Sequence, residues 1–113
     1  KIFNGITGIL EEYCPVDMAI EKLFFSRNTT SALQVSEARG VILLAAARQK
    51  IPVTEYTPNQ VKLAVTGSGA ADKRQVQDMT ARLLRLPEIV RPDDAADGLA
   101  LALCHMHTRR GRG

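Results

Sequence analysis

The sequence has no tryptophan, only two cysteines and no apolar run near the ~20 residues that a membrane-spanning helix needs. A disulfide-built domain, a transmembrane segment and a secretory signal are therefore not expected. We expect a soluble, cytoplasmic protein in which Cys14 and Cys104 are buried, reduced thiols; a disulfide between them is the less favoured alternative. Hydrophobic residues make up 45% of the 113 residues, which suits a single core and argues against a second domain.

A strong charge of one sign is also lacking. The net charge is +3, and Arg109, Arg110 and Arg112 in the tail "RRGRG" account for all of it. The rest of the chain is neutral, so nucleic-acid binding has to be argued from where the charges lie. We predict one domain over residues 1–107 and a disordered basic tail over residues 108–113.

Apolar periodicity and capping residues predict alternating helices and strands. Apolar residues at three- and four-residue steps indicate a first helix that ends before Pro15 and a long helix over residues 31–49. The runs "VDMAIE" and "PVTEYTP" are typical of short strands. Three more helices are expected: from Thr57 and Pro58 to Gly67, from an Asp72–Gln75 capping box to Pro87, and from Asp93 or Asp94 to about His107.

This order of elements favours an α/β layer with parallel strands. A stable sheet normally has three or more strands, so we expect that strands are missing or that another chain supplies them. The sequence begins at Lys1, without a methionine and inside a helical pattern, which we interpret as a cut.

Two aspartates, Asp94 and Asp97, lie one helical turn apart at the start of the apolar run "GLALALC". Helix capping is the simple interpretation, because acids in a first turn gain about 0.3–1 kcal/mol from the helix dipole. However, Leu101 follows Asp94 by seven residues and Cys104 follows Asp97 by seven, so the same helix face continues as apolar surface. We therefore expect both carboxylates to point into the fold or into a cleft.

A third acid, Glu21, closes the first strand, which is where ligands collect in open α/β sheets. A plain surface position is the alternative interpretation of this glutamate. Three carboxylates brought together repel one another unless a cation or proton intervenes, and oxygen ligands suit Mg²⁺ or Mn²⁺. The spacing permits a two-ion site for phosphodiester hydrolysis.

Side chains suited to nucleic acid follow Glu21 directly. Phe24 and Phe25 are adjacent, so one of them could stack on a base while the other packs in the core. Arg27 and Asn28, next along the chain, could contact phosphate.

A glycine-rich turn in "VKLAVTGSGAADKRQVQ" is flanked by Lys62, Lys73 and Arg74. It contains no Walker pattern, so a nucleotide-binding loop is not indicated. These cations could hold a nucleic-acid backbone, although solvated helix-surface residues explain them equally well.

Three stretches resemble the RuvC family of Holliday junction resolvases, the crossover junction endodeoxyribonucleases of bacteria. They are "MAIEKLFFSRNTTSALQVSEARGVILLAAA", "EYTPNQVKLAVTGSGAADKRQVQDM" and "DDAADGLALALCHMH", and they cover nearly the whole chain in family order. The resemblance implies a ribonuclease-H-like fold, with helices packed on a mixed sheet, and a homodimer. It also implies Mg²⁺-dependent nicking of four-way DNA junctions in recombination and repair.

The resemblance also implies roles for individual residues. The implied metal-binding, catalytic carboxylates are Glu21, Asp94 and Asp97. Phe24 falls on the aromatic residue associated with junction distortion, and Lys62 and Lys73 fall on lysines close to the scissile DNA, where Lys73 would neutralise developing charge. The long helix over residues 31–49 resembles the dimer-forming helix, and branch-migration proteins of the same system are further candidate partners.

One part of the family pattern is missing. The family site also needs an aspartate from a first strand with an Asp-Pro-Gly signature, and no such segment occurs in this sequence. Residues 1–107 are therefore expected to be a partial nuclease domain that lacks the first strands of the sheet and is inactive alone. The alternative is a non-catalytic DNA-binding or dimerisation fragment of the same family. A related nuclease acting on other nucleic acid is disfavoured by "GSGAADKRQVQ".

Overall fold

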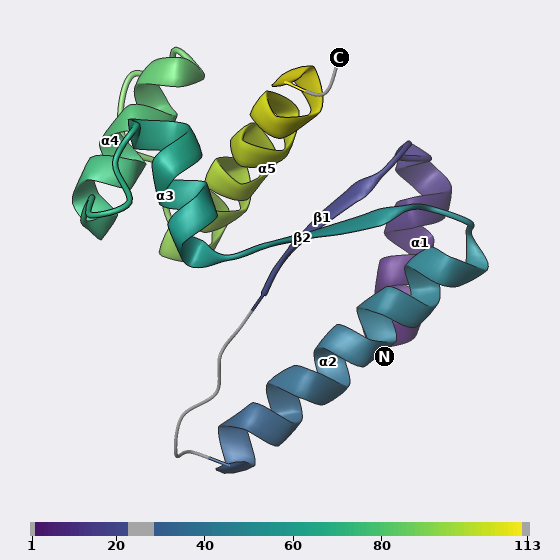
Figure 1. Cartoon of the computed structure of the whole chain (residues 1–113). Helices are drawn as coiled ribbons and strands as arrows, with labels where there is room; N and C mark the ends of the chain where they lie inside the picture. Colours follow the sequence, from purple (N-terminus) through teal and green to yellow (C-terminus); the bar gives the residue numbers. More distant parts are fainter. Residues whose placement is uncertain (1, 23–28, 112–113) are drawn as a thin grey trace. The chain divides into compact units, whose positions relative to one another are not determined.

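The computed structural model describes residues 2–22 and 29–111. Seven elements follow in the order α1 (Ile2–Tyr13), β1 (Met18–Glu21), α2 (Thr29–Arg48), β2 (Val53–Tyr56), α3 (Pro58–Thr66), α4 (Lys73–Leu83) and α5 (Asp93–Gly111) (Figure 1). The expected alternation of helices and strands is confirmed. Phe24, Phe25, Arg27 and Asn28, which the sequence assigns to DNA contact, lie outside the described residues.

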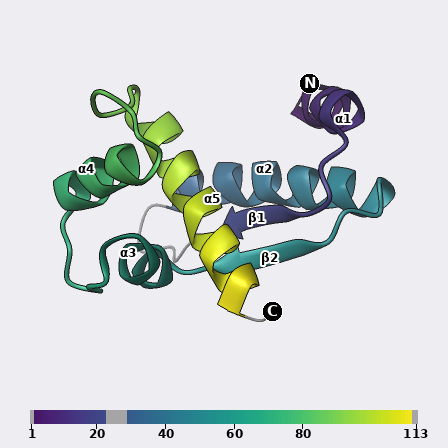
Figure 2. The ribbon, with the colours of Figure 1, turned by 90° about the horizontal axis from the view of Figure 1, so that it is seen from above.

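The strands β1 and β2 lie side by side (Figures 1 and 2). The amide of Met18 donates to the carbonyl of Pro52 at 2.9 Å, and the amide of Lys22 donates to that of Tyr56 at 2.7 Å. Because both numbers rise together, the strands are parallel. The α/β class is confirmed, whereas the antiparallel part of a mixed sheet is not found within residues 2–22 and 29–111.

Contacts divide the chain into two compact units. The first unit takes α1, Met18, α2 and the chain up to Thr54; the second takes Ala19–Lys22 and the chain from Glu55 onward. None of the helices in the described part of the chain combines the length and apolar character needed to cross a bilayer.

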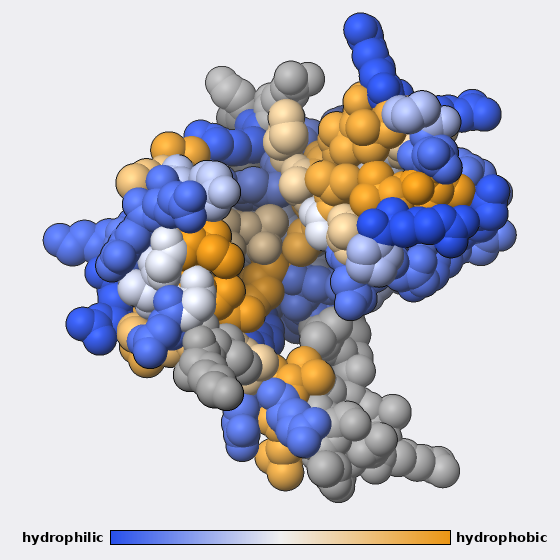
Figure 3. Space-filling view, turned by 180° about the vertical axis from the view of Figure 1, so that it is seen from behind, coloured by the Kyte–Doolittle hydropathy of each residue, from blue (hydrophilic) through white to orange (hydrophobic). Residues whose placement is uncertain are grey.

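The first unit is built on the packing of α1 against α2. Leu10, Ala45 and Ala46 are buried where the helices meet, and the Arg48 guanidinium lies 5.7 Å from the centre of the Phe3 ring. Small residues on α2 allow close approach of the two helices. Figure 3 shows apolar surface among polar side chains on one face of the molecule. In the first unit, several large apolar side chains are exposed; on α2 they are Leu33, Val35 and Leu44.

The two cysteines differ from each other. Cys104 is buried, as expected, but Cys14 is exposed, so the prediction of a buried thiol is wrong for Cys14. The reason is local: Cys14 follows the end of α1 with φ at +47°, and its Sγ donates to the carbonyl of Glu11 at 3.2 Å. Both thiols are free, so no disulfide joins them.

The second unit has helices that begin with reciprocal side-chain hydrogen bonds. Thr57 Oγ1 accepts from the amide of Gln60 at 3.1 Å, and the Gln60 side chain accepts from the amide of Thr57 at 2.7 Å. Asp72 and Gln75 make the same pair of bonds at the start of α4, both at 2.8 Å. The predicted starts of α3 and α4 are therefore confirmed, and Gly67, with φ at +82°, ends α3 as expected.

Two helix ends differ from the sequence prediction. Helix α4 stops at Leu83 instead of near Pro87, because Arg85 adopts φ of +57° and the amide of Leu86 returns to the carbonyl of Ala81 at 2.8 Å. This is a Schellman motif with arginine in the position where glycine is usual, so its signal is weak in sequence. Helix α5 continues past His107 to Gly111, so residues 108–111 are helical and the expectation of a disordered tail is wrong for them.

Helix α5 packs against both α3 and α4 through a stripe of small side chains. Ala96, Ala100 and Cys104 follow one another at four-residue steps and are each at most 3% exposed. The Cys104 Sγ lies 3.7 Å from the carbonyl of Gln60 on α3. Small residues on this face bring α3 and α4 close to α5 and leave room for a pocket beside the stripe.

Candidate active site

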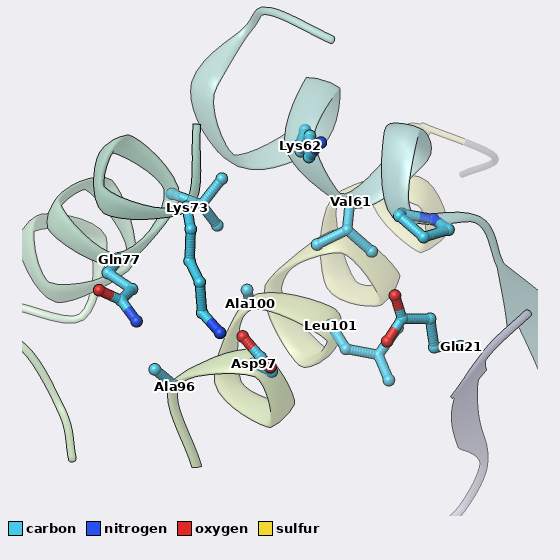
Figure 4. Close-up of a pocket in the computed structure, with 11 residues that line it drawn as sticks. Glu21, Val61, Lys62, Lys73, Gln77, Ala96, Asp97, Ala100 and Leu101 are labelled. Atoms are coloured by element: carbon cyan, nitrogen blue, oxygen red, sulfur yellow. The ribbon is translucent and has the colours of Figure 1, made fainter. Parts of the chain in front are cut away.

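A pocket of about 270 Å³ lies in the second unit (Figure 4). Its walls come from the end of β1, from α3, from the first two turns of α4 and from the first half of α5. Among its lining residues two carry carboxylates and two carry ammonium groups. The lining residues are Glu21, Pro58, Val61, Lys62, Lys73, Val76, Gln77, Ala96, Asp97, Ala100 and Leu101.

Glu21 is the last residue of β1 and is half-buried. Burial raises the pKa of its carboxyl group above the ordinary value, and the negative charge of Asp97 raises it further. The two groups are thus close enough to repel each other, and in Figure 4 Leu101 lies between them as they face the pocket from different elements. Repulsion of this kind is relieved by a proton or by a cation.

The two aspartates of α5 take different positions. Asp97 lines the pocket, as expected, and is exposed. Asp94 lies in the first turn of α5, is also exposed and is not among the pocket's lining residues. Its position agrees with the capping interpretation, while its negative charge also raises the pKa of Lys73, so its part in the site stays a prediction.

Lys73, the first residue of α4, is held by a partner that the sequence did not reveal. Its Nζ lies 3.2 Å from Oδ2 of Asp93, and the Gln77 side chain donates to the other oxygen of Asp93 at 3.2 Å. The hydrogen bond and charge of Asp93 raise the pKa of Lys73, and the charges of Asp97 and Asp94 add to this effect. Conversely, Lys73 lowers the pKa of Asp93.

The Lys73–Asp93 ion pair orients the Lys73 side chain and contributes little to stability. The two side chains are 59% and 63% exposed, and exposed ion pairs contribute little to folding. The bond directs the Lys73 ammonium toward the start of α5, where Asp97 lies (Figure 4). The sequence did not predict that Asp93 contacts Lys73 and Gln77, because Asp93 is far from both in sequence. The one available signal is that Gln77 follows Lys73 by one helical turn.

The remaining predicted cations separate. Lys62 lines the pocket with Lys73. Arg74 does not: its Nε lies 3.4 Å from Oδ1 of Asp78, one turn further along α4. Of the three cations that flank the glycine-rich turn, the fold thus brings two to the carboxylates.

The donor set suits a hard divalent cation in type but is incomplete in number. Glu21 and Asp97 offer oxygen ligands of the kind that Mg²⁺ prefers. Within residues 2–22 and 29–111, however, no group of three or more acidic, histidine or cysteine side chains is placed to hold a metal ion. The described residues therefore supply two of the oxygen ligands that a metal site would need.

Comparison with known proteins gives a consistent result. The family model described as crossover junction endodeoxyribonuclease RuvC matches residues 1–105. The chain is similar to the RuvC of Pseudothermotoga lettingae, at 53% identity over 108 residues, covering 96% of this chain and 67% of that protein. It is also similar to the RuvC of Brevibacillus brevis, at 53% identity over 109 residues, covering 96% and 66%.

Solved structures agree with the sequence matches. The structure of Thermus thermophilus RuvC superposes with a TM-score of 0.88 at 38% identity, covering 96% of this chain and 66% of that one. The same protein in complex with a Holliday junction substrate gives a TM-score of 0.90 at the same identity and coverage. The predicted ribonuclease-H-like fold class is confirmed by these neighbours. The chain spans about two thirds of the length of the relatives that it matches.

Proposed function

Because this chain belongs to the RuvC family of crossover junction endodeoxyribonucleases, we propose that it serves a nuclease that nicks four-way DNA junctions in recombination and repair. The observation that carries the proposal is the pocket in which Glu21 and Asp97 repel each other, with Lys62 and Lys73 in its wall. In phosphodiester hydrolysis, positive side chains lie next to the negatively charged DNA backbone, and carboxylates hold a metal cation. The two ammonium groups and two carboxylates of the pocket suit this arrangement.

In this proposal Glu21, Asp97 and Asp94 hold Mg²⁺, with Mn²⁺ as a possible substitute. Bound ions of this type supply a nucleophilic water and stabilise the leaving oxygen. Lys73, held toward Asp97 by Asp93, neutralises charge that develops on the phosphate, and Lys62 contacts the backbone. The resemblance implies a fourth carboxylate, from an Asp-Pro-Gly strand, so we expect this chain alone to be inactive.

The DNA contacts of the segment after β1 stay predictions. Phe24 is proposed to stack on a base at the junction, and Phe25, Arg27 and Asn28 to contact the DNA next to it. Their position in sequence directly after Glu21 supports this part of the proposal.

A homodimer is proposed through α2. The helix exposes Leu33 and Leu44 at 64% and 55% of their surface, and exposed apolar side chains that share a helix face are candidates for an interface. Replacing Leu44 with lysine should shift a dimer toward monomer in sedimentation experiments, and an unchanged mass would contradict this interface. Branch-migration proteins of the same system stay candidate partners.

The test of the nuclease proposal is the nicking of a synthetic four-way junction in the presence of Mg²⁺, with linear duplex of the same sequence as the substrate control. In the full-length protein, Glu21→Gln should abolish nicking and leave junction binding in EDTA intact. Glu12→Gln, an exposed change on α1, is the matched control and should nick normally. Unchanged nicking by the Glu21 variant would overturn the assignment.

The second candidate is a non-catalytic DNA-binding or dimerisation fragment. The incomplete donor set of the described residues favours it. Calorimetry separates the two: a fragment with three carboxylates should bind Mg²⁺ weakly and hold at most one ion. Two tight Mg²⁺ sites in this chain would exclude the fragment interpretation.

A further inference from the structure

Tyr56, the last residue of β2, is linked to both elements that carry the pocket's carboxylates. Its carbonyl accepts from the amide of Lys22 at 2.7 Å, and Lys22 is the residue after Glu21. Its hydroxyl lies 2.6 Å from Nδ1 of His105 on α5, the helix that carries Asp97. One residue is thus bonded through its backbone to the Glu21 strand and through its side chain to the Asp97 helix.

The side-chain link is well defined. Tyr56 is 4% exposed, and its ring meets the His105 ring edge-on, with 5.6 Å between centroids and 70° between planes. A neutral imidazole with its proton on Nε2 accepts the tyrosine O–H at Nδ1. Because the hydroxyl is buried, losing this partner leaves an unsatisfied polar group and favours movement of α5 against β2.

The Tyr56–His105 hydrogen bond lies next to residues that line the pocket or pack beside it. Thr57 and Pro58, directly after Tyr56, begin α3, and Pro58 lines the pocket. Cys104, next to His105, contacts the carbonyl of Gln60 on α3. The bonds of Tyr56 therefore lie where β1, α3 and α5 all meet.

We propose that Tyr56 is a positioning residue that sets the separation between Glu21 and Asp97, through its hydrogen bond to His105. The inference rests on the proposed function and deepens it, because the separation of two carboxylates decides how well they share a cation. Groups that orient ligands without touching the ion commonly change metal affinity by about 10–100-fold.

The test measures Mn²⁺ affinity of the 113-residue chain by water-proton relaxation, together with circular dichroism. Tyr56→Phe keeps the ring and should weaken Mn²⁺ binding about tenfold, the lower end for such groups. Tyr13→Phe, which alters the chain's other tyrosine, is 71% exposed in the wild type and should bind normally. His105→Ala should weaken Mn²⁺ binding to the same extent as Tyr56→Phe. Its matched control, His107→Ala, should bind Mn²⁺ normally.

A cycle of variants separates positioning from plain stabilisation. The double variant Tyr56→Phe with His105→Ala should lose no more Mn²⁺ affinity than either single variant, because both remove the same bond. His105→Gln keeps an acceptor and should restore affinity. Additive losses, or losses that follow the folded fraction alone, would overturn the inference.

The failure of the inference is distinguishable from the failure of the proposed function. Absence of Mn²⁺ binding by the unaltered chain would overturn the metal site, and the positioning role with it. Equal Mn²⁺ binding by the unaltered chain and by Tyr56→Phe would overturn the positioning role alone and leave the nuclease proposal standing.

Discussion

The two compact units of the chain are stabilised in different ways. In the first unit, α1 and α2 meet through Leu10 and two alanines, while leucines of α2 stay exposed. In the second unit, capping boxes define the starts of α3 and α4, and small residues of α5 pack against both helices. The difference indicates that the first unit offers apolar surface for association, whereas the second is built to hold charged groups in place.

The largest effect is expected from overfilling the contact face of α5. Cys104→Leu introduces two more non-hydrogen atoms at a position that is 1% exposed and that contacts α3, so the free energy of unfolding should fall by about 1–3 kcal/mol. Ala102→Leu, two residues away and exposed, is the control and should be nearly neutral. Urea titration followed by circular dichroism measures both.

Overfilling a buried position of the first unit tests the comparison directly. Ala45→Leu, at a position with 0% exposure between α1 and α2, should lower the free energy of unfolding by less than Cys104→Leu, because neighbouring apolar side chains of this unit can move outward into solvent; the exposed Ala47→Leu is its control. If Ala45→Leu is tolerated while Cys104→Leu is not, the first unit is the more adaptable of the two. Equal tolerance at both buried sites would contradict the contrast between the units.

Loss of a capping box should have a moderate effect. Asp72→Ala removes the acceptor for the Gln75 amide at the start of α4 and should lower the free energy of unfolding by about 1 kcal/mol. Asp72→Asn keeps an acceptor and should be close to wild type. If the alanine variant is as stable as the asparagine variant, the cap does not hold the helix start that carries Lys73.

Glu21→Gln should stabilise the second unit slightly at neutral pH. The folded pKa of Glu21 is raised, so its ionisation opposes folding; this unfavourable contribution is absent below the ordinary pKa of 4.5 and appears as pH rises through the folded pKa. The variant should therefore have a higher melting temperature at pH 7 and show no such gain at pH 4. A lower melting temperature at pH 7 would show that the carboxylate is favourably placed.

Asp93→Asn should change stability least and still alter the site. The ion pair with Lys73 is exposed, so the melting temperature should fall only slightly, through the lost favourable interaction of the Asp93 charge with the start of α5. The pKa of Lys73 should fall toward its ordinary value, because its largest raising influence is removed. An NMR titration of the lysine side chain measures this, with Asp78→Asn as the matched control on α4; an unchanged Lys73 titration would exclude the pairing.

Local patterns were enough to predict most elements of the fold. Apolar steps indicated α1 and α2, and the residues Thr57, Gly67 and Asp72 indicated where α3 and α4 begin or end. The end of α4 was missed because Arg85 takes a conformation that glycine usually marks, and the length of α5 was missed although no glycine or proline stands between His107 and Gly111. Helix ends without a capping signature are set by packing as well as by sequence.

The sequence predicted the acidic residues of the candidate site but not the contacts that surround them. The strand-end position of Glu21 and the apolar face below Asp97 were readable because each depends on a local period. The partners Asp93, Gln77, Tyr56 and His105 were not predicted, because their contacts join residues that are 16 to 49 positions apart or lie on different elements.

The sequence alone determined the helices and strands, the neutral body and the family to which the chain belongs, because each depends on local periodicity or on long matching stretches. The tertiary structure decided which of the predicted residues meet. It placed Asp97 in the pocket wall, joined Lys73 to Asp93, and linked Tyr56 to His105. The physical reason is that helix faces are set by residue spacing, whereas the distance between groups on different helices is set by how closely small side chains allow those helices to pack.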